Sequence, residues 1–483
     1  MKGDFTRDSF DRFRHYTRVA MQQGRVQLDA DWNEQASITQ HYLRTLALDL
    51  IGPSGGPVDN CGFAVITDPG HLDALTDAYG RPLDGSRLGE IRARLAAGDF
   101  VIGTGRYYVD GLLCENDAPV TYTEQPGYPF GDRTGLENLR GAQQFLVYLD
   151  VWERHISAAE DPGIVEVALG GSDTATRVQL VWQVKVLRGD GSDGCGNLTA
   201  LRRTYPPLMR AKAVAPHDDT VPRLTGPQTR YRGAENQLYR VEIHRGGTAG
   251  AETEGATFKW SRENGSVVFP VRNVSADSDA ERTTVAVATL GRDKRTGLAV
   301  GDIVELVDDT YTLRESADPL YVVNSVNRDR LEVVMSGTGS GTIGQDSRLH
   351  PLLRRWDHGS GGTHAKDATG GTVLLSEATG IDEGWIGLED GVAVQFPASI
   401  IEGQPNEYRS GDYWLIPART AAGDVVWPRR RVDDQPEARP PNGVQHRYAP
   451  LALATMDDNS ALVVEADCRS AFDTMPRANG IPE

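Results

Sequence analysis

Cysteine is scarce in this chain, and long apolar runs are missing. Its 483 residues contain four cysteines, Cys61, Cys114, Cys195 and Cys468, which lie far apart and form no CxxC pair. This spacing argues against a structural zinc site and against a disulfide framework, so buried free thiols are expected. No stretch approaches the roughly 20 apolar residues that cross a bilayer, which argues against membrane insertion.

Positive charge is also in short supply. Lysine and arginine number 50 against 68 aspartates and glutamates, which leaves a formal net charge of −18. A nucleic-acid-binding surface needs a basic stripe to displace counterions, and binding to an anionic membrane needs positive charge as well, so neither is expected as a partner. The start of the chain lacks the apolar core of a secretory signal, which predicts cytoplasmic assembly.

Signatures of enzymes are missing as well. The sequence has no Walker A, HExxH or GxSxG motif, and no pair of carboxylates is marked out for glycoside hydrolysis. Residues 190–194 resemble part of a calcium loop but lack its later glutamate, so a solvated turn is expected. His358 and His364 flank a glycine-rich loop and are expected to face solvent. We therefore predict no catalytic residue, no metal and no cofactor.

Turn-forming residues between short apolar segments are plentiful. The chain has 53 glycines and 26 prolines, which suits a β-rich protein. Residues 100–115 predict a β-hairpin around Asp110-Gly111, residues 86–97 a short helix, and the even strand spacing in residues 283–336 a small SH3-like barrel. The predicted fold is mainly β and multi-domain, with short-strand sandwiches or barrels, an N-terminal arm and one amphipathic helix.

Four consecutive domains are predicted. They are an arm and helix in residues 1–52, a β-rich domain in 53–280, an SH3-like barrel in 281–340 and a second β-rich domain in 341–483. Glycine-rich connections at the ends of the first and third segments favour these boundaries.

The most informative segment, residues 24–35 (GRVQLDADWNEQ), follows a polar arm. Asp29 or Asp31 can cap the start of a helix, and Asp31 and Glu34 have a spacing like that of a capping box. Acidic residues at this end also complement the helix dipole. Because each carboxylate has a structural role available, the pattern favours a helix start over a catalytic cluster.

The helix itself is predicted over residues 31–50, with Gly52 and Pro53 ending it. Its apolar residues fall near one stripe at helical spacing: Trp32, Ala36, Leu43, Leu46 and Leu50. Burying these five residues is expected to contribute about 5–10 kcal/mol as an upper bound.

Several segments together resemble one known family. They are residues 2–10, 21–35, 147–162, 257–265 (TFKWSRENG) and 411–419 (GDYWLIPAR). In these segments the chain resembles a bacterial family of uncharacterised-domain proteins associated with phage-tail-like contractile injection systems. The element at residues 23–34 is similar to the start of some tail-fibre and baseplate-associated proteins.

The resemblance implies a non-enzymatic structural subunit, at or near the baseplate of an extracellular contractile particle. Its expected partners are other subunits of that particle, with a homo-oligomer in the assembly. The arm offers five partner-binding positions by strand addition or helix-in-groove contact: Phe5, Phe10, Tyr16, Arg25 and Trp32.

Three alternatives stay open at this point. The arm can fold back onto its own β-domain instead of reaching a neighbour. The chain can be a carbohydrate-binding or carbohydrate-cleaving tail-fibre protein, or a free lectin-like module. Its eight tryptophans offer faces for sugars, although most lie in apolar segments where core packing is favoured.

Overall fold

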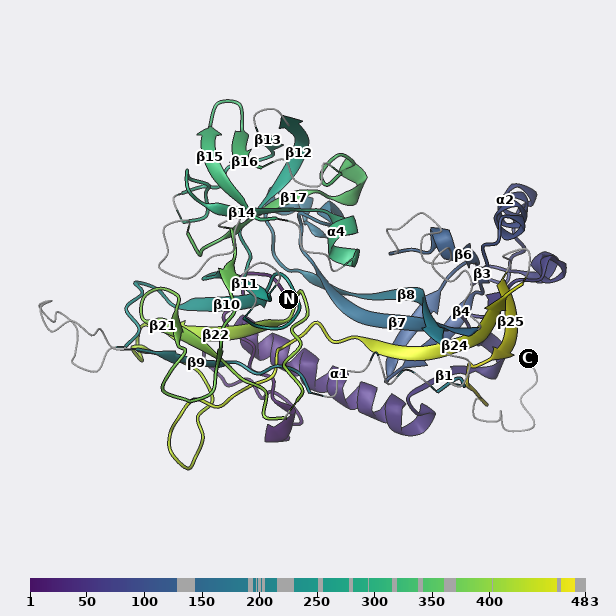
Figure 1. The fold of residues 1–483 in the computed structure, drawn as a ribbon, viewed down its shortest axis with the longest axis horizontal. Coiled ribbons are helices and arrows are strands. Elements are labelled where there is room, and N and C mark those ends of the chain that lie inside the picture. Colours follow the sequence, from purple (N-terminus) through teal and green to yellow (C-terminus); the bar gives the residue numbers. More distant parts are fainter. Residues whose placement is uncertain are drawn as a thin grey trace, which may run out of the picture.

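Strands dominate the chain (Figure 1). A computed structural model describes residues 1–127, 144–189, 194–196, 198, 201, 205–214, 230–250, 255–277, 281–293, 295–314, 319–337, 342–359, 371–401, 403–457 and 462–473. Strands make up 38% and helices 16% of the structure, in several sheets and a six-stranded barrel. This confirms the prediction of a mainly β, multi-domain fold.

Three sheets form the right-hand body in Figure 1. Their strand orders are β26-β1-β4-β5, β2-β3-β6 and β25-β24-β7-β8. The strands are β1 (Ser54–Pro57), β2 (Val65–Ile66), β3 (Val101–Ile102), β4 (Gly105–Val109), β5 (Leu112–Asn116), β6 (Val120–Thr121), β7 (Gln144–Ile156), β8 (Arg177–Gly189), β24 (Arg447–Met456), β25 (Leu462–Asp467) and β26 (Ala471–Phe472). Buried apolar side chains such as Phe63, Tyr107 and Phe145 form its core.

The left-hand body is built from two sheets. One has the order β18-β11-β10-β22-β23, and the other combines β19-β21-β20 with β9, which pairs with β21. The strands are β9 (Arg210–Ala213), β10 (Gln237–Ile243), β11 (Thr257–Ser261), β18 (Val373–Leu374), β19 (Glu377–Ala378), β20 (Ile386–Gly387), β21 (Val392–Pro397), β22 (Tyr413–Arg419) and β23 (Asp424–Val425). Aromatic residues including Phe258, Phe396 and Trp414 fill the core.

A closed barrel stands above the left-hand body. Its strands follow the order β12-β13-β16-β15-β14-β17. They are β12 (Val268–Asp277), β13 (Arg282–Val287), β14 (Ile303–Val307), β15 (Tyr321–Asn327), β16 (Glu332–Ser336) and β17 (Leu352–Trp356). β17 closes the barrel because it pairs with both β12 and β14. The barrel thus draws on strands outside the expected segment 281–340.

Strands from distant parts of the sequence share sheets. β7 pairs with β24, and β1 pairs with β26, so strands from the segments 53–280 and 341–483 lie side by side. Strand pairing is decided by which register places the apolar face of a strand on the core, so strands far apart in the sequence can be neighbours in one sheet. The division into four consecutive domains stays a prediction.

The predicted hairpin is confirmed as β4 and β5. Asp110 and Gly111 both have positive φ angles, 45° and 77°, as a two-residue turn with this twist requires. Gly111 has a second role, because a Cβ there would lie 2.3 Å from the carbonyl oxygen of Arg44. The turn therefore packs directly against the helix that contains Arg44.

That helix is α1 (Asp29–Ile51), which runs along the lower side of the molecule between the two bodies (Figure 1). The other described helices are α2 (Gly85–Ala96), which confirms the helix predicted at residues 86–97, and α4 (Asp309–Arg314). Short 3₁₀ helices are η1 (Arg12–Arg14), η2 (Val58–Asn60), η3 (Pro69–Ala74), η4 (Tyr122–Glu124), η5 (Pro162–Ile164), η6 (Val167–Leu169) and η7 (Ser347–Leu349). Among the described residues, no helix is long and apolar enough to cross a membrane.

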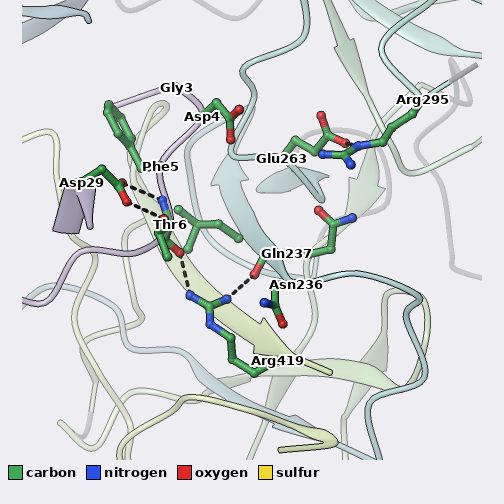
Figure 2. Close-up of a pocket in the computed structure, with 11 residues that line it drawn as sticks. Gly3, Asp4, Phe5, Thr6, Asp29, Asn236, Gln237, Glu263, Arg295 and Arg419 are labelled. Carbon is green, nitrogen blue, oxygen red and sulfur yellow. Dashed lines mark hydrogen bonds and ion pairs between the residues drawn. The ribbon is translucent and has the colours of Figure 1, made fainter. Parts of the chain in front are cut away.

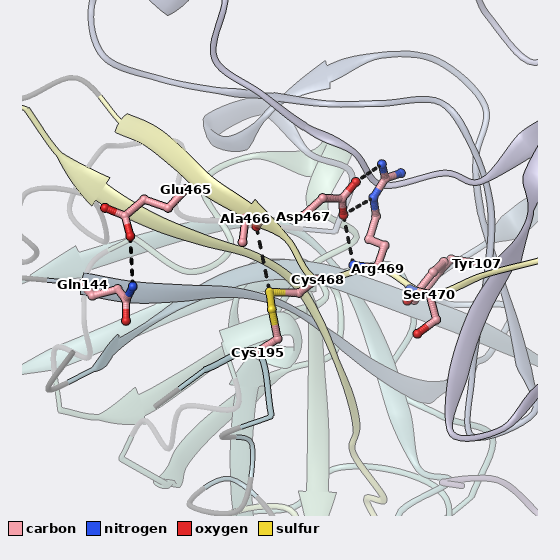
Figure 3. The surroundings of a disulfide bond; sticks show 9 residues. All are labelled: Tyr107, Gln144, Cys195, Glu465, Ala466, Asp467, Cys468, Arg469 and Ser470. Atoms are coloured by element: carbon pink, nitrogen blue, oxygen red, sulfur yellow. Dashed lines mark hydrogen bonds and ion pairs between the residues drawn. A yellow bond between two sulfur atoms is a disulfide. The ribbon is translucent and has the colours of Figure 1, made fainter. Parts of the chain in front are cut away.

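Cys195 and Cys468 form a disulfide (Figure 3). Their Cα atoms lie 5.4 Å apart, within the range that a disulfide bridges. The expectation of free thiols is therefore wrong for this pair. The two residues are separated by 273 positions, and their proximity follows from sheet pairing that spacing along the chain does not reveal. Cys61 and Cys114 are free, and burial raises the pKa of Cys114 to about 12.

Candidate functional site

The start of α1 differs from the predicted cap. Leu28 is the N-cap residue and makes no side-chain cap bond, whereas Asp29 already lies inside the helix. The Asp29 carboxylate instead accepts hydrogen bonds from the backbone amide and the hydroxyl of Thr6, the first at 2.8 Å. Burial opposes ionisation of Asp29, but these bonds lower the pKa of its carboxyl below the ordinary value. The prediction of Asp29 or Asp31 as N-cap is wrong.

The predicted capping box does not form either. Glu34 accepts a hydrogen bond from the Ser9 hydroxyl at 2.6 Å, and Gln35 accepts one from the backbone amide of Val19 at 2.8 Å. Together with Asp29, these side chains hold the arm along the first turns of α1. Asp29 and Glu34 thus have a structural role, because each binds a residue of the arm.

The first residues of the arm fold back onto the chain's own β10 and β11 region. The ammonium group of Lys2 lies 3.0 Å from the Glu242 carboxylate, and Asn264 donates to the carbonyl oxygen of Gly3 at 2.9 Å. Arg240 donates to the carbonyl oxygen of Met1 at 3.0 Å. We call residues 1–8 the docked segment.

Beneath the docked segment lies a buried charge cluster of Arg240, Glu242, Lys259 and Glu305, which the half-buried Lys2 joins from the segment itself. Glu242 lies 2.6 Å from Arg240 and 3.4 Å from Lys259, which also pairs with Glu305. Burial disfavours ionisation of Glu305, but Lys259 and Lys2 lower its pKa to about 2. Burial lowers the pKa of Lys2 to about 8, although Glu242 opposes this shift. Opposite charges thus lie side by side where water is excluded.

A polar pocket of about 400 Å³ lies beside the docked segment (Figure 2). Its lining comes from the arm, the start of α1, strands β10 and β22, and the connections that follow β11 and β13, and it includes Asp4, Gln237, Glu263 and Arg295. Arg419 closes one side by donating to the carbonyl oxygens of Thr6, at 2.7 Å, and Gln237, at 3.1 Å. Amide, carboxylate and guanidinium groups in one pocket suit a small polar ligand.

The apolar stripe of α1 points away from the protein. Exposed fractions are 66% for Trp32, 61% for Leu43, 56% for Leu46 and 75% for Leu50, and Ala36 is exposed too. The helix buries only Ala30 and Ile38. The single chain therefore leaves the stripe uncovered, and the stabilisation expected from its burial does not arise within it.

The inner face of α1 is held mainly by polar contacts, which explains this orientation. Arg44 forms a bidentate ion pair with Glu153 of β7, with distances of 2.6 and 3.1 Å. His41 packs against Phe10, with ring centroids 5.8 Å apart. A helix anchored through these groups, as well as through Glu34, presents its opposite side to solvent.

The five predicted partner-binding residues divide into two groups. Phe5 packs edge-on against His155, at 5.8 Å between ring centroids, and Phe10 packs against His41. Tyr16, Arg25 and Trp32 are exposed. The chain's own fold thus brings the first two against its surface and leaves the other three accessible. A role for any of them in binding a partner stays a prediction.

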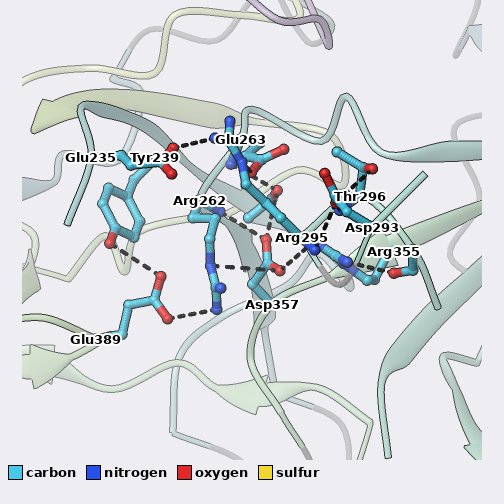
Figure 4. Close-up of polar contacts among 12 residues, drawn as sticks. Glu235, Tyr239, Arg262, Glu263, Asp293, Arg295, Thr296, Arg355, Asp357 and Glu389 are labelled. Carbon is cyan, nitrogen blue, oxygen red and sulfur yellow. Dashed lines mark hydrogen bonds and ion pairs between the residues drawn. The ribbon is translucent and has the colours of Figure 1, made fainter. Parts of the chain in front are cut away.

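A second polar cluster lies between the left-hand body and the barrel (Figure 4). Arg262 lies between Glu389, at 2.7 Å, and Asp357, at 3.7 Å. Burial raises the pKa of Glu389 to about 7, although Arg262 opposes the shift. Such a pKa suits proton transfer, but Tyr239 donates to one Glu389 oxygen at 3.1 Å and Arg262 to the other. Both oxygens are thus bonded within the cluster, which indicates a structural role.

Sequence patterns did not identify Glu242, Glu305 or Glu389. One weak signal was available, because Glu305 is a charged residue within the otherwise apolar strand β14. A charge at such a position is expected to be paired when buried. Arg240 lies on the same strand as Glu242, but Lys2 and Lys259 come from distant segments and could not be named in advance.

His358 was expected to face solvent, and this is wrong. It is buried, its Nε2 lies 2.8 Å from the carbonyl oxygen of Gly371, and burial lowers its pKa to about 4. His364 and residues 190–193 lie outside the described residues. Within the part of the chain that the structure describes, no group of three or more His, Cys, Asp or Glu is arranged to hold a metal ion.

Comparisons with known proteins give one match. A family described as a family of unknown function (DUF6519) matches residues 1–194 and 190–477. Neither a curated protein nor a solved structure matches the chain. The matched residues include the arm, α1, both β-bodies and the barrel. The chain therefore belongs to this family of unknown function (DUF6519).

Proposed function

We propose that this protein is a non-enzymatic structural subunit of a larger assembly and that it attaches through its N-terminal arm and α1. The observation that carries the proposal is the outward stripe of Trp32, Leu43, Leu46 and Leu50. Contiguous exposed apolar surface of this kind marks interaction sites. Covering four half-exposed side chains would contribute roughly 4–8 kcal/mol before the cost of association.

The exposed part of the arm extends this surface. Phe13, Tyr16, Met21 and Val26 are exposed as well, and all lie between the docked segment and α1. The docked segment fixes one end of the arm and the first turns of α1 fix the other. The residues between them are thereby presented to a neighbour at a low ordering cost.

We further propose that the assembly is an extracellular phage-tail-like contractile particle and that the protein lies at or near its baseplate. Only the resemblance of the five segments supports this finer assignment. Under this assignment the particle assembles in the cytoplasm and is then found outside the cell. The partners of the chain are baseplate proteins and further copies of the chain.

The test is incorporation into particles purified from the native host. A tagged chain is expected to co-purify with them, and a Leu43→Glu/Leu46→Glu variant is expected to be lost from them. Thr45→Glu adds a charge to an exposed position off the stripe and serves as the matched control. If the stripe variant is recovered as well as the control, the attachment role is wrong. If the wild-type chain is absent from all particles, the particle assignment falls.

The second candidate function is carbohydrate binding, and the polar pocket favours it. Its amide and carboxylate groups are of the type that bind sugar hydroxyls. A glycan array would detect binding, and release of reducing sugars would detect cleavage. Gln237→Ala is expected to reduce glycan binding if the pocket is the site, whereas Gln40→Ala on the exposed surface of α1 is the control. An array without signal would exclude this candidate.

A further inference from the structure

The exposed stripe of α1 has the spacing of a helix-pairing seam. Counting Thr39, which is also exposed, successive positions along it lie 4, 3, 4, 3 and 4 residues apart. They are Trp32, Ala36, Thr39, Leu43, Leu46 and Leu50. Alternation of 3 and 4 places side chains along the line where two helices interlock. The seam covers fewer than three heptads, so it suits a short helix pair and not a fibrous shaft.

The polar member of the seam can be buried without loss of hydrogen bonding. The Thr39 hydroxyl donates to the carbonyl oxygen of Gln35 at 3.0 Å and accepts from the Gln35 side chain at 3.2 Å. Its bonding groups are thus used within the same helix, and its methyl group is free to pack. The Thr39 layer of the seam therefore requires no water.

We propose that the seam binds the same seam of a second copy, as an antiparallel helix pair. The inference rests on the proposed function and names the partner of the same site. In one antiparallel register, Trp32 meets Leu50 of the second copy, Ala36 meets Leu46, and Thr39 meets Leu43. Each layer then combines a residue from the first half of the seam with a leucine from the second half.

Side-chain volume favours this orientation over a parallel one. A parallel pair would place Ala36 against Ala36 and Thr39 against Thr39, which leaves the middle of the seam underfilled. In the antiparallel register, a leucine of the second copy packs against each of the small residues Ala36 and Thr39, as close packing requires. It also sets the two helix dipoles in opposite directions.

The charges beside the seam fit a copy of the same chain. Its edges carry Asn33, Gln40 and Ala47 on one side, and Gln35, Tyr42 and Asp49 on the other. In the antiparallel register Asp49 lies opposite Gln35 of the second copy, so no like charges meet. A chain of net charge −18 repels its own copies, and an edge with a single charge keeps this repulsion low. The arm reaches this edge through the Val19–Gln35 bond, and the seam residues themselves are exposed.

Sedimentation of the full chain over a range of concentrations tests the pairing. The wild-type chain is expected to form a dimer as concentration rises. Leu46→Glu is expected to weaken the dimer about tenfold or more, because it places an unpaired charge in the seam. Thr45→Glu, on the same helix but off the seam, is expected to dimerise like the wild type. Far-UV circular dichroism checks that all variants retain their helices.

A charge-pair variant tests the register. Ala36→Lys/Leu46→Glu is expected to restore the dimer, because each glutamate then faces a lysine of the second copy. In a parallel pair, lysine would face lysine and glutamate would face glutamate, and the dimer would be weaker still. Failure of the double variant to recover dimerisation would overturn the antiparallel register.

Comparison with particle incorporation separates this inference from the proposed function. A chain that stays monomeric at all concentrations, yet needs Leu46 to enter particles, would overturn self-pairing and leave the attachment role standing. A chain that dimerises through Leu46 but never enters a particle would overturn the particle assignment alone. A monomer that enters particles regardless of Leu46 would overturn both.

Discussion

The two longer described helices, α2 and α1, turn their apolar sides in opposite directions, α2 towards the protein and α1 towards solvent. In α2, Ile91 and Leu95 are buried against Leu72 and Val101, as in most helices on a protein surface. In α1 the apolar stripe faces solvent and the inner face is held by ion pairs and hydrogen bonds. The comparison shows that an apolar stripe predicts a helix and a buried face, but not whether the same chain buries it.

The difference lies in how each helix is anchored. α2 is fixed by apolar burial, with Asp84 capping its first turn by accepting from the backbone amide of Arg87 at 2.9 Å. α1 is fixed through charged groups, and the docked segment adds the buried charge cluster at its N-terminal end. A helix held in this way keeps its apolar surface available. Four changes would break or sharpen the comparison.

The largest effect is expected from Glu242→Gln in the buried charge cluster. Loss of this charge leaves Lys2, Arg240 and Lys259 without their shared partner, and breaking a buried ion pair costs about 3–5 kcal/mol. Denaturant unfolding measures the loss. Glu115→Gln, at an exposed position of β5, is expected to change stability by less than about 0.5 kcal/mol. If Glu242→Gln and Glu115→Gln lower the stability equally, the cluster does not anchor the arm.

At acid pH, Glu305 should lose its contribution to the stability of the folded protein. Its pKa is about 2 in the folded protein and 4.5 in the unfolded chain. Because the pKa is lower in the folded protein, the ionised Glu305 carboxylate stabilises the fold by roughly 3 kcal/mol. This contribution is complete above pH 4.5 and is lost as the pH falls towards 2. The stability difference between the wild type and Glu305→Gln should therefore shrink across this range. A difference that stays constant would contradict the role given to its charge.

A somewhat smaller effect is expected from Ile91→Ala in α2. Removing a buried isoleucine leaves a cavity and costs about 2–3 kcal/mol, near the lower end for such changes because the surrounding cluster is small. The loss should depend little on salt, since no charge is involved. Thermal unfolding at low and high salt measures both quantities.

The smallest effect is expected from Leu43→Ala in α1. This side chain is mostly exposed in the single chain, so at low concentration stability should change by less than about 0.5 kcal/mol. At concentrations where copies associate, the same substitution should lower the unfolding midpoint through loss of association. A large loss in the dilute protein would mean that the stripe packs within its own chain.

Local patterns predicted much of the fold. The β4–β5 hairpin followed from Asp110-Gly111, because few other residues adopt two successive positive φ angles. α2 was predicted, and so were the barrel strands β13 to β16, but β12 and β17 lie outside the segment predicted for the barrel. The start of α1 was predicted within two residues, but Asp29 and Glu34 bind Thr6 and Ser9 of the arm, and the predicted capping box does not form.

Contacts between distant segments could not be predicted from the sequence. The Cys195–Cys468 disulfide and the Lys2–Glu242 ion pair join residues more than 200 positions apart. Their partners are chosen by sheet pairing and by the path of the arm. Among 68 acidic residues, nothing in the sequence distinguished Glu242 as the partner of Lys2.

By itself, the sequence determined where turns, strands and helices form, because φ preferences and apolar periodicity act over a few neighbouring residues. The tertiary structure alone decided which side of α1 is covered, since this depends on where Glu153 and the docked segment lie in space. The free energy of burial depends on what lies opposite a side chain, and that is a property of the whole fold.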